Sequence, residues 1–197
     1  PDVAIPFALD HPWFLLVELT DTLPGAELRA PLEAALAAAL EDGTVADAIL
    51  PESHAQAAAL WRIRHSVSEG SKAAGHVVSH DSVVPLENQA AFVAQVERRI
   101  LQAVPEARVV MHGHVGDGNI HVLAILDRAR PDLAAAALRI NEAVDDVTAA
   151  QGGVISAEHG IGQSNRARLA RVAAPAELDL MRRVKALLDP HSIMNPG

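Results

Sequence analysis

The stretch RVVMHGHVGDGNIHVLAIL, residues 108–126, decides the fold of this chain. Two apolar segments flank an Asp-Gly pair at positions 117 and 118. An Asp-Gly pair between apolar segments is a strong signal for a two-residue hairpin turn, because both central residues of that turn take positive φ. The stretch therefore predicts two antiparallel strands, and these strands carry three histidines.

The position of the turn fixes which histidines face each other. With the turn at this Asp-Gly pair, His114 lies opposite His121, and their Cβ atoms are expected to be roughly 4.5–5.5 Å apart on one face of the hairpin. Metal–nitrogen bonds are about 2.0–2.1 Å long, so two imidazoles at this separation can bind one ion. His112 is expected on the same face, opposite Leu123. The alternative is that these histidines are hydrogen-bonded core residues or belong to a polar loop.

Periodicity along the rest of the chain predicts further helices and strands. Helices are expected at residues 26–42, 53–70, 87–104, 131–151 and 176–189. Strands are expected at residues 13–20, 44–50, 76–86, 108–115 and 119–126, with a short strand and a glycine-rich turn over 152–162. This order predicts an α+β domain whose antiparallel β-sheet carries its helices mainly on one face, with ferredoxin-like elements.

The composition disfavours several classes of protein. No apolar run reaches the roughly 18 residues of a transmembrane helix, and without cysteine the chain has neither disulfides nor thiolate metal ligands. A net charge of -9, no block of Lys and Arg, and an aromatic content of 3% disfavour a nucleic-acid partner. No signal peptide is visible, and the chain opens with Pro1 rather than Met, which suggests a fragment without its upstream part.

The segment ISAEHGIG, residues 155–162, supplies a third candidate metal ligand. Glu158 and His159 stand where a short apolar strand gives way to glycines, which permit unusual backbone torsions and the close approach of a ligand. Two histidines and one carboxylate leave open positions on an ion, as catalytic sites do. A neighbouring histidine that does not bind the ion can then act as a general base. The alternative for this pair is an exposed turn.

Several motifs together resemble one family. The chain resembles the C-terminal domain of FAD-linked oxidases in the motifs HGHVGDGNIHV, ISAEHGIG and the ending DPHSIMNPG. The helix LWRIRHSVSEG and the strand VVSHDSVVPL also resemble it and stand in the expected order. That family contains D-lactate dehydrogenase, the glycolate oxidase flavoprotein subunit and D-2-hydroxyglutarate dehydrogenase. The resemblance implies that residues 1–197 form the cap that binds substrate and metal. The N-terminal FAD-binding domain is absent from this chain, since no glycine-rich dinucleotide loop follows a strand.

The resemblance assigns roles to the histidine motifs. It implies that His114, His121 and Glu158 bind a divalent metal ion, with zinc expected, and that His114 also contacts the substrate. His159 would remove the proton of the α-hydroxyl group while a hydride leaves the α-carbon for FAD. The ion would hold the substrate oxygens and act as a Lewis acid.

The resemblance also assigns three residues outside these motifs. Arg64 would bind the substrate carboxylate, for which a guanidinium is suited by its bidentate geometry, and Ser68, one turn later, would be a second contact. Asn195 would approach the flavin ring. Without the resemblance, Arg64 reads as an ordinary surface arginine and Asn195 as part of a terminal turn.

Two positions depart from members of the family that act on dicarboxylates. The resemblance implies that some of those members carry a lysine where this chain has Ser79, and an asparagine where it has Leu123. Both departures remove polar contacts to the distal end of a substrate. The resemblance therefore implies a D-2-hydroxy acid with a small or apolar side chain, such as D-lactate, which is oxidised to the 2-oxo acid.

Two other functions remain open on the residues alone. A metal-dependent hydrolase is one, because the same donors can activate water, and a catalytically silent binding or assembly module of the same fold is the other. For the flavoenzyme, we expect this fragment alone to be inactive and not to retain FAD. The full-length protein is expected in the cytoplasm or peripheral to a membrane, with an unidentified electron acceptor and a homodimer as a further expectation.

Overall fold

The structure is a computed structural model that describes residues 5–23 and 25–196. It divides into two compact units, Pro1–Gly70 and Ser71–Gly197. The sheet and the histidine motifs all belong to the second unit.

The first unit contains helix α1 (Arg29–Glu41) and most of helix α2 (His54–Ala74), which continues past the unit boundary. Both helices confirm predictions, those for residues 26–42 and 53–70. Ser53 precedes α2, and its hydroxyl oxygen accepts a hydrogen bond from the Gln56 N–H at 3.3 Å, which satisfies a donor of the first helical turn. After α1, Gly43 takes a φ of 77° that ends the helix.

Two predicted strands, residues 13–20 and 44–50, are wrong. The first segment is irregular and most of its large side chains are exposed, with Leu15 at 74%. An apolar run becomes a strand only where another strand accepts its backbone hydrogen bonds, and neither segment is paired with the three described strands. In the second segment, the Asp47 carboxylate accepts the Ala48 N–H at 2.8 Å, and such local side-chain bonds compete with strand pairing.

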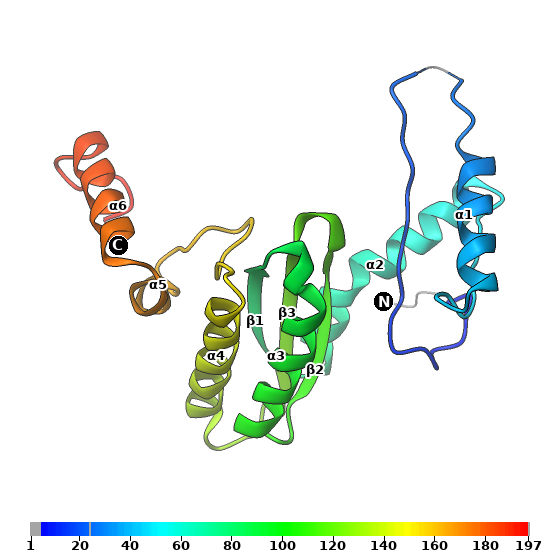
Figure 1. The fold of residues 1–197 in the computed structure, drawn as a ribbon. Coiled ribbons are helices and arrows are strands. Elements are labelled where there is room, and N and C mark those ends of the chain that lie inside the picture. Colours follow the sequence, from blue (N-terminus) through cyan, green and yellow to red (C-terminus); the bar gives the residue numbers. More distant parts are fainter. Residues whose placement is uncertain (1–4, 24, 197) are drawn as a thin grey trace. The chain divides into compact units, whose positions relative to one another are not determined.

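The second unit is built on a three-stranded antiparallel sheet with the order β1-β3-β2 (Figure 1). The strands are β1 (His76–Val83), β2 (Arg108–His114) and β3 (Asn119–Leu126). The apolar strand β3 lies in the middle, where both of its edges are paired. The predicted α+β architecture is confirmed.

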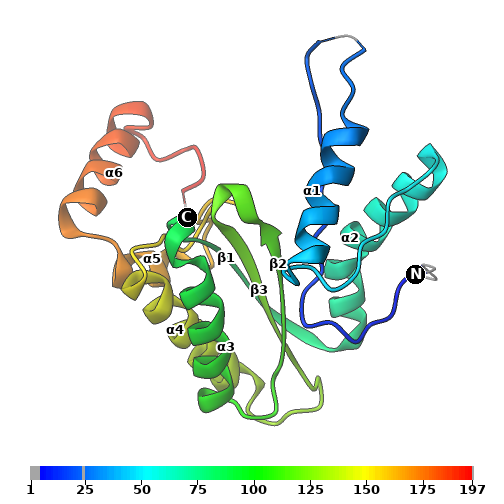
Figure 2. The ribbon, with the colours of Figure 1, turned by 45° about the vertical axis from the view of Figure 1, so that its right-hand side comes forward.

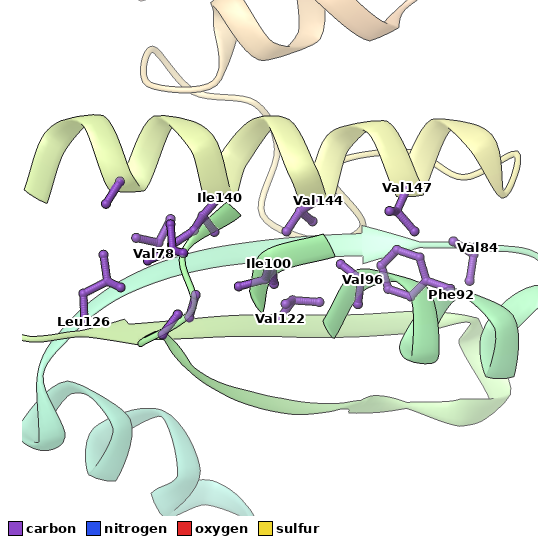
Figure 3. Packing of buried hydrophobic residues seen from close by; sticks show 14 residues of the cluster. Val78, Val84, Phe92, Val96, Ile100, Val122, Leu126, Ile140, Val144 and Val147 are labelled. Carbon is purple, nitrogen blue, oxygen red and sulfur yellow. The ribbon is translucent and has the colours of Figure 1, made fainter. Parts of the chain in front are cut away.

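Helices α3 (Gln89–Ala103) and α4 (Leu133–Ala150) lie side by side against one face of the sheet (Figure 2). Phe92, Val96 and Ile100 recur at a spacing of four residues on α3, and all three are fully buried, as expected for an amphipathic helix. Figure 3 shows apolar side chains of the core gathered between α4, α3 and the strands. Strand alternation therefore sends every second residue of β1 and β3 into this core and the others to the opposite face.

The remaining elements are short or peripheral. The predicted strand within 152–162 reduces to two isolated bridges, in which Ser156 pairs with Asp81 and Val154 pairs with Val83. Two short 3₁₀ helices are η1 (Leu86–Asn88) and η2 (Val115–Asp117). Helix α6 (Pro175–Leu188) confirms a prediction, whereas α5 (Arg166–Val172) was not predicted. No helix in the described part of the chain is long and apolar enough to cross a membrane.

Candidate functional site

The β2–β3 hairpin exists, but its predicted register is wrong by two residues. His112, not His114, is the partner of His121, and His114 pairs with Asn119. The turn is longer than the predicted Asp-Gly pair because η2 precedes Gly118, the only residue of this turn with a recorded positive φ, 71°. Tertiary hydrogen bonds stabilise the longer turn. The Gln89 side chain donates to the Val115 carbonyl at 2.8 Å, and the Val84 N–H donates to the Gly118 carbonyl at 3.0 Å.

A shift of two residues leaves the side chains on the same faces. His112, His114 and His121 therefore share the face of the sheet opposite α3 and α4, which we call the site face. The ring centroids of His112 and His121 are 4.8 Å apart, and those of His114 and His121 are 6.3 Å apart. The predicted gathering of the three imidazoles is thus present, with His112 as the direct partner of His121.

Asp81 extends this row across the sheet. It is the β1 partner of His121, as His112 is the β2 partner, so the three side chains form one row over all three strands. Asp81 is 9% exposed, and Nδ1 of His121 lies 3.3 Å from its Oδ1 atom. Sequence reasoning missed Asp81, although a carboxylate inside a predicted strand is the kind of signal that marks such a residue.

The Asp81 carboxylate also holds the segment that carries the other candidate residues. Its Oδ2 atom accepts hydrogen bonds from the backbone N–H groups of Ala157, Glu158 and His159, at 3.0, 2.9 and 3.2 Å. The His159 Nδ1 atom lies 3.6 Å from the same oxygen, and the His159 and His121 rings stack with centroids 5.7 Å apart and planes 13° apart. The backbone of Glu158 and the ring of His159 are thus held at Asp81, and the His159 ring lies beside His121 although the two are remote in sequence.

The charge of Asp81 follows from these contacts. Burial acts to raise the pKa of Asp81, but the hydrogen bonds from the Glu158 and His159 N–H groups, the charge of the His159 ring and the Ala157 N–H act to lower it. The net result is a pKa below the ordinary value. Asp81 is therefore an anion at neutral pH, and it faces two imidazoles.

The donor types on the site face suit a divalent ion, since zinc takes imidazole nitrogen and carboxylate oxygen. Within residues 5–23 and 25–196, however, no group of three or more His, Cys, Asp or Glu side chains is arranged to hold an ion. His114 and Glu158 are both exposed. The residues therefore match a metal ion in the chemistry of their donor atoms but are not gathered around one point, and metal binding stays a prediction.

Arg64, Ser68 and Asn195 lie on other elements. Arg64 is half-buried and Ser68 is exposed on α2 in the first unit, and their spacing of four residues puts them on one face of the helix. Asn195 is exposed in the turn after α6 and has a φ of 48°, which asparagine adopts more readily than most residues. The roles that the resemblance gives these three residues stay predictions.

The two departures from the dicarboxylate pattern lie side by side. Ser79 and Leu123 are direct partners across β1 and β3, and Val110 is the β2 partner of Leu123. They form the row next to that of Asp81 and His121, on the same site face. A substrate bound over His121 would therefore meet both departures together.

Comparison with known proteins identifies the class. The family model described as FAD linked oxidases, C-terminal domain, matches residues 2–197, and the chain belongs to this family. It is 34% identical over 194 residues to a D-2-hydroxyglutarate dehydrogenase of Xanthomonas citri pv. viticola, covering 98% of this chain and 40% of the relative. The resemblance drawn from the motifs is thus confirmed.

Two further relatives are named as a D-2-hydroxyglutarate dehydrogenase and as a D-lactate dehydrogenase. A probable mitochondrial D-2-hydroxyglutarate dehydrogenase of Oryza sativa subsp. japonica is 36% identical, over 93% of this chain and 32% of the relative. A D-lactate dehydrogenase of Anaerostipes hadrus is 32% identical, over 87% of this chain and 36% of the relative. The chain thus spans two fifths or less of the length of these relatives.

Proposed function

We propose that the full-length protein containing this chain is an FAD-dependent dehydrogenase that oxidises a D-2-hydroxy acid to the 2-oxo acid. Membership of the FAD-linked oxidase family and relatives named for two such acids support the proposal. The observation that carries it is the pair of stacked imidazoles, His121 and His159, beside the Asp81 carboxylate. In this proposal, His159 is the general base, and its ring lies beside His121 of the central strand and Asp81 of β1.

In this proposal, the residues of the chain bind and deprotonate the substrate. Arg64 and Ser68 hold the carboxylate, and His159 takes the hydroxyl proton as the C–H bond at the α-carbon breaks. FAD, bound mainly by the part of the protein outside this chain, supplies the acceptor for the hydride. Asn195 is the residue of this chain assigned to FAD, and its exposed turn fits a contact with the edge of the cofactor.

The flavin spectrum of the full-length protein tests the proposal. We expect a yellow protein whose flavin absorbance bleaches when a D-2-hydroxy acid is added without oxygen. A colourless protein that hydrolyses esters or amides would support the metal-dependent hydrolase instead, and a protein that does neither would support a silent module. The compartment, the electron acceptor and the oligomeric state stay predictions of the sequence.

A divalent metal is part of the same proposal. His114, His121 and Glu158 would hold the ion, which supplies Lewis-acid chemistry at the substrate oxygens. Titration of zinc into the chain by calorimetry is expected to show one site, and His121→Ala is expected to weaken it by at least about 10–100-fold. His76→Ala, which changes an exposed histidine at the start of β1, is the matched control. Equal, weak binding in all three proteins would contradict the metal site.

The substrate is expected to have a small or apolar side chain. A second carboxylate over Ser79 and Leu123 would lack a cation, and a buried unpaired charge costs several kcal/mol. Leucine offers no polar group at this position, and an alkyl group moved from water into apolar surroundings gains about 0.8 kcal/mol for each buried CH₂. The full-length enzyme should therefore have a higher kcat/KM for D-lactate and D-2-hydroxybutyrate than for D-2-hydroxyglutarate.

A double variant tests this argument in the opposite direction. Ser79→Lys combined with Leu123→Asn should raise the kcat/KM ratio of D-2-hydroxyglutarate to D-lactate by roughly tenfold or more. Val110→Ala changes a neighbour in the same row without adding charge, and it should leave this ratio near that of the parent. A clear preference of the parent enzyme for the dicarboxylate would contradict the role given to the two departures.

A further inference from the structure

We propose that Asp81 is a positioning residue that sets the tautomer of His159 and His121, so that the Nε2 atom of each ring is left to act on substrate or metal. This inference rests on the proposed function for its catalytic meaning. The contacts that support it are those of Asp81 with the two rings and with the backbone of residues 157–159.

The first step is that Asp81 fixes the backbone of the turn. Three successive N–H groups, those of Ala157, Glu158 and His159, donate to one carboxylate oxygen. The Asp81 carbonyl also accepts the Ala157 N–H at 3.1 Å, and Asp81 forms a bridge with Ser156. Strand β1 pairs with β3 along its whole length. The turn at residues 157–159 is therefore attached to a strand that the sheet holds in place.

The second step concerns the rings. Both rings contact the Asp81 carboxylate through Nδ1. The His121 Nδ1 atom lies 3.3 Å from Oδ1, and the His159 Nδ1 atom lies 3.6 Å from Oδ2. A carboxylate favours the proton on the imidazole nitrogen that faces it. The two rings lie almost parallel, 13° apart, and the same carboxylate lies beside Nδ1 of both.

The third step follows from imidazole chemistry. A neutral ring with its proton on Nδ1 carries its lone pair on Nε2, which can accept a proton or bind a metal ion. The same logic orients the histidine of hydrolytic triads, where the partner carboxylate selects the useful tautomer. In this chain, one carboxylate would prepare His159 as a base and His121 as a ligand at the same time.

Nitrogen NMR of the 197-residue chain tests the tautomers without any need for activity. In metal-free protein, at a pH where both rings are neutral, we expect His159 and His121 to carry their proton on Nδ1. In Asp81→Asn, both rings should shift toward the Nε2–H form that free histidine prefers in water. Asp127→Asn is the matched control, because Asp127 lies just beyond the end of β3 and accepts the Ala129 N–H in an exposed turn.

The wild-type spectrum alone can overturn the proposal. If His159 carries its proton on Nε2 in the wild-type chain, the proposal is wrong, whether or not Asp81→Asn folds. Unchanged tautomers in a folded Asp81→Asn chain would be equally decisive against it. A residue with a merely structural role would change stability and leave the tautomers of the folded chain as they were.

Kinetics of the full-length enzyme then connect the tautomer to the reaction. Asp81→Asn is expected to lower kcat by about 10²–10⁴-fold, the contribution of a well-placed general base, with little change in KM. If the wild-type enzyme oxidises no 2-hydroxy acid although the NMR result is as expected, the proposed function fails and the positioning role stands. A wild-type enzyme that is active and an Asp81→Asn variant with unchanged kcat would refute the positioning role.

Discussion

Replacing Arg168 with alanine is expected to lower the free energy of unfolding of the second unit by about 3 kcal/mol, the lower end of the range for breaking a buried ion pair. The Asp145 side chain on α4 is 1% exposed. Arg168 on α5 donates to both of its oxygens, with Nε at 3.2 and 3.1 Å and Nη2 at 2.5 Å. Without Arg168, Asp145 still has the Arg171 contact at 3.0 Å, which is why the loss stays at the lower end.

Urea unfolding measures this effect, and an exposed pair provides the control. Arg183 pairs with Asp179 one turn earlier on α6, and both side chains are largely exposed. Arg183→Ala should therefore cost no more than about 0.5 kcal/mol. Similar small losses in the two variants would show that the Asp145 pair does not anchor α5.

Acidification from pH 6.5 to about 4 is expected to remove about 3 kcal/mol of stability through His80 alone. Burial, and then the positive charge of Arg168, lower the pKa of His80 from 6.5 to about 4, against smaller opposite effects of Asp145 and Asn141. The folded chain therefore binds the proton less well than the unfolded chain. Stability from this group is complete above pH 6.5 and is lost as the pH falls toward 4.

His80→Gln isolates this contribution. Glutamine does not titrate, and its amide can still donate to the Asn141 Oδ1 atom, which lies 2.9 Å from His80 Nε2 in the structure. The variant should be less stable than the parent at pH 7 and should lose less stability between pH 6.5 and 4. Carboxylates such as Asp81 also lose stability in acid, but equally in both proteins, so parallel pH curves would contradict the role of His80.

Local pattern predicted the parts of the fold whose causes are local. Helix α3 and strand β3 follow directly from apolar spacing, and alternation along the hairpin placed His112, His114 and His121 on one face. The register of that hairpin did not follow, because the length of its turn depends on hydrogen bonds from Gln89 and Val84. These donors come from other parts of the chain, and a turn motif carries no information about them.

The candidate site, too, could be predicted only in the parts that depend on local sequence. The sequence singled out Glu158 and His159 because glycines follow them, and the structure brings His159 against His121. It did not single out Asp81, whose N–H partners lie more than 70 residues away. Helix α5 was missed for a similar reason, since its seven residues are held by Arg168 and Arg171 against Asp145.

The side chains of the site face are arranged in rows across the three strands, and this arrangement separates two groups of residues. Asp81, His121 and His112 form one row, and Ser79, Leu123 and Val110 form the next. Each row is spaced by backbone hydrogen bonds, so exchanges within the second leave the spacing of the first unchanged. Under the proposed function, mutation at Ser79, Leu123 and Val110 would change substrate range and leave the row of Asp81, His121 and His112 in place. Under the same proposal, a library randomised at these three positions is expected to change the relative kcat/KM of different 2-hydroxy acids more than kcat itself.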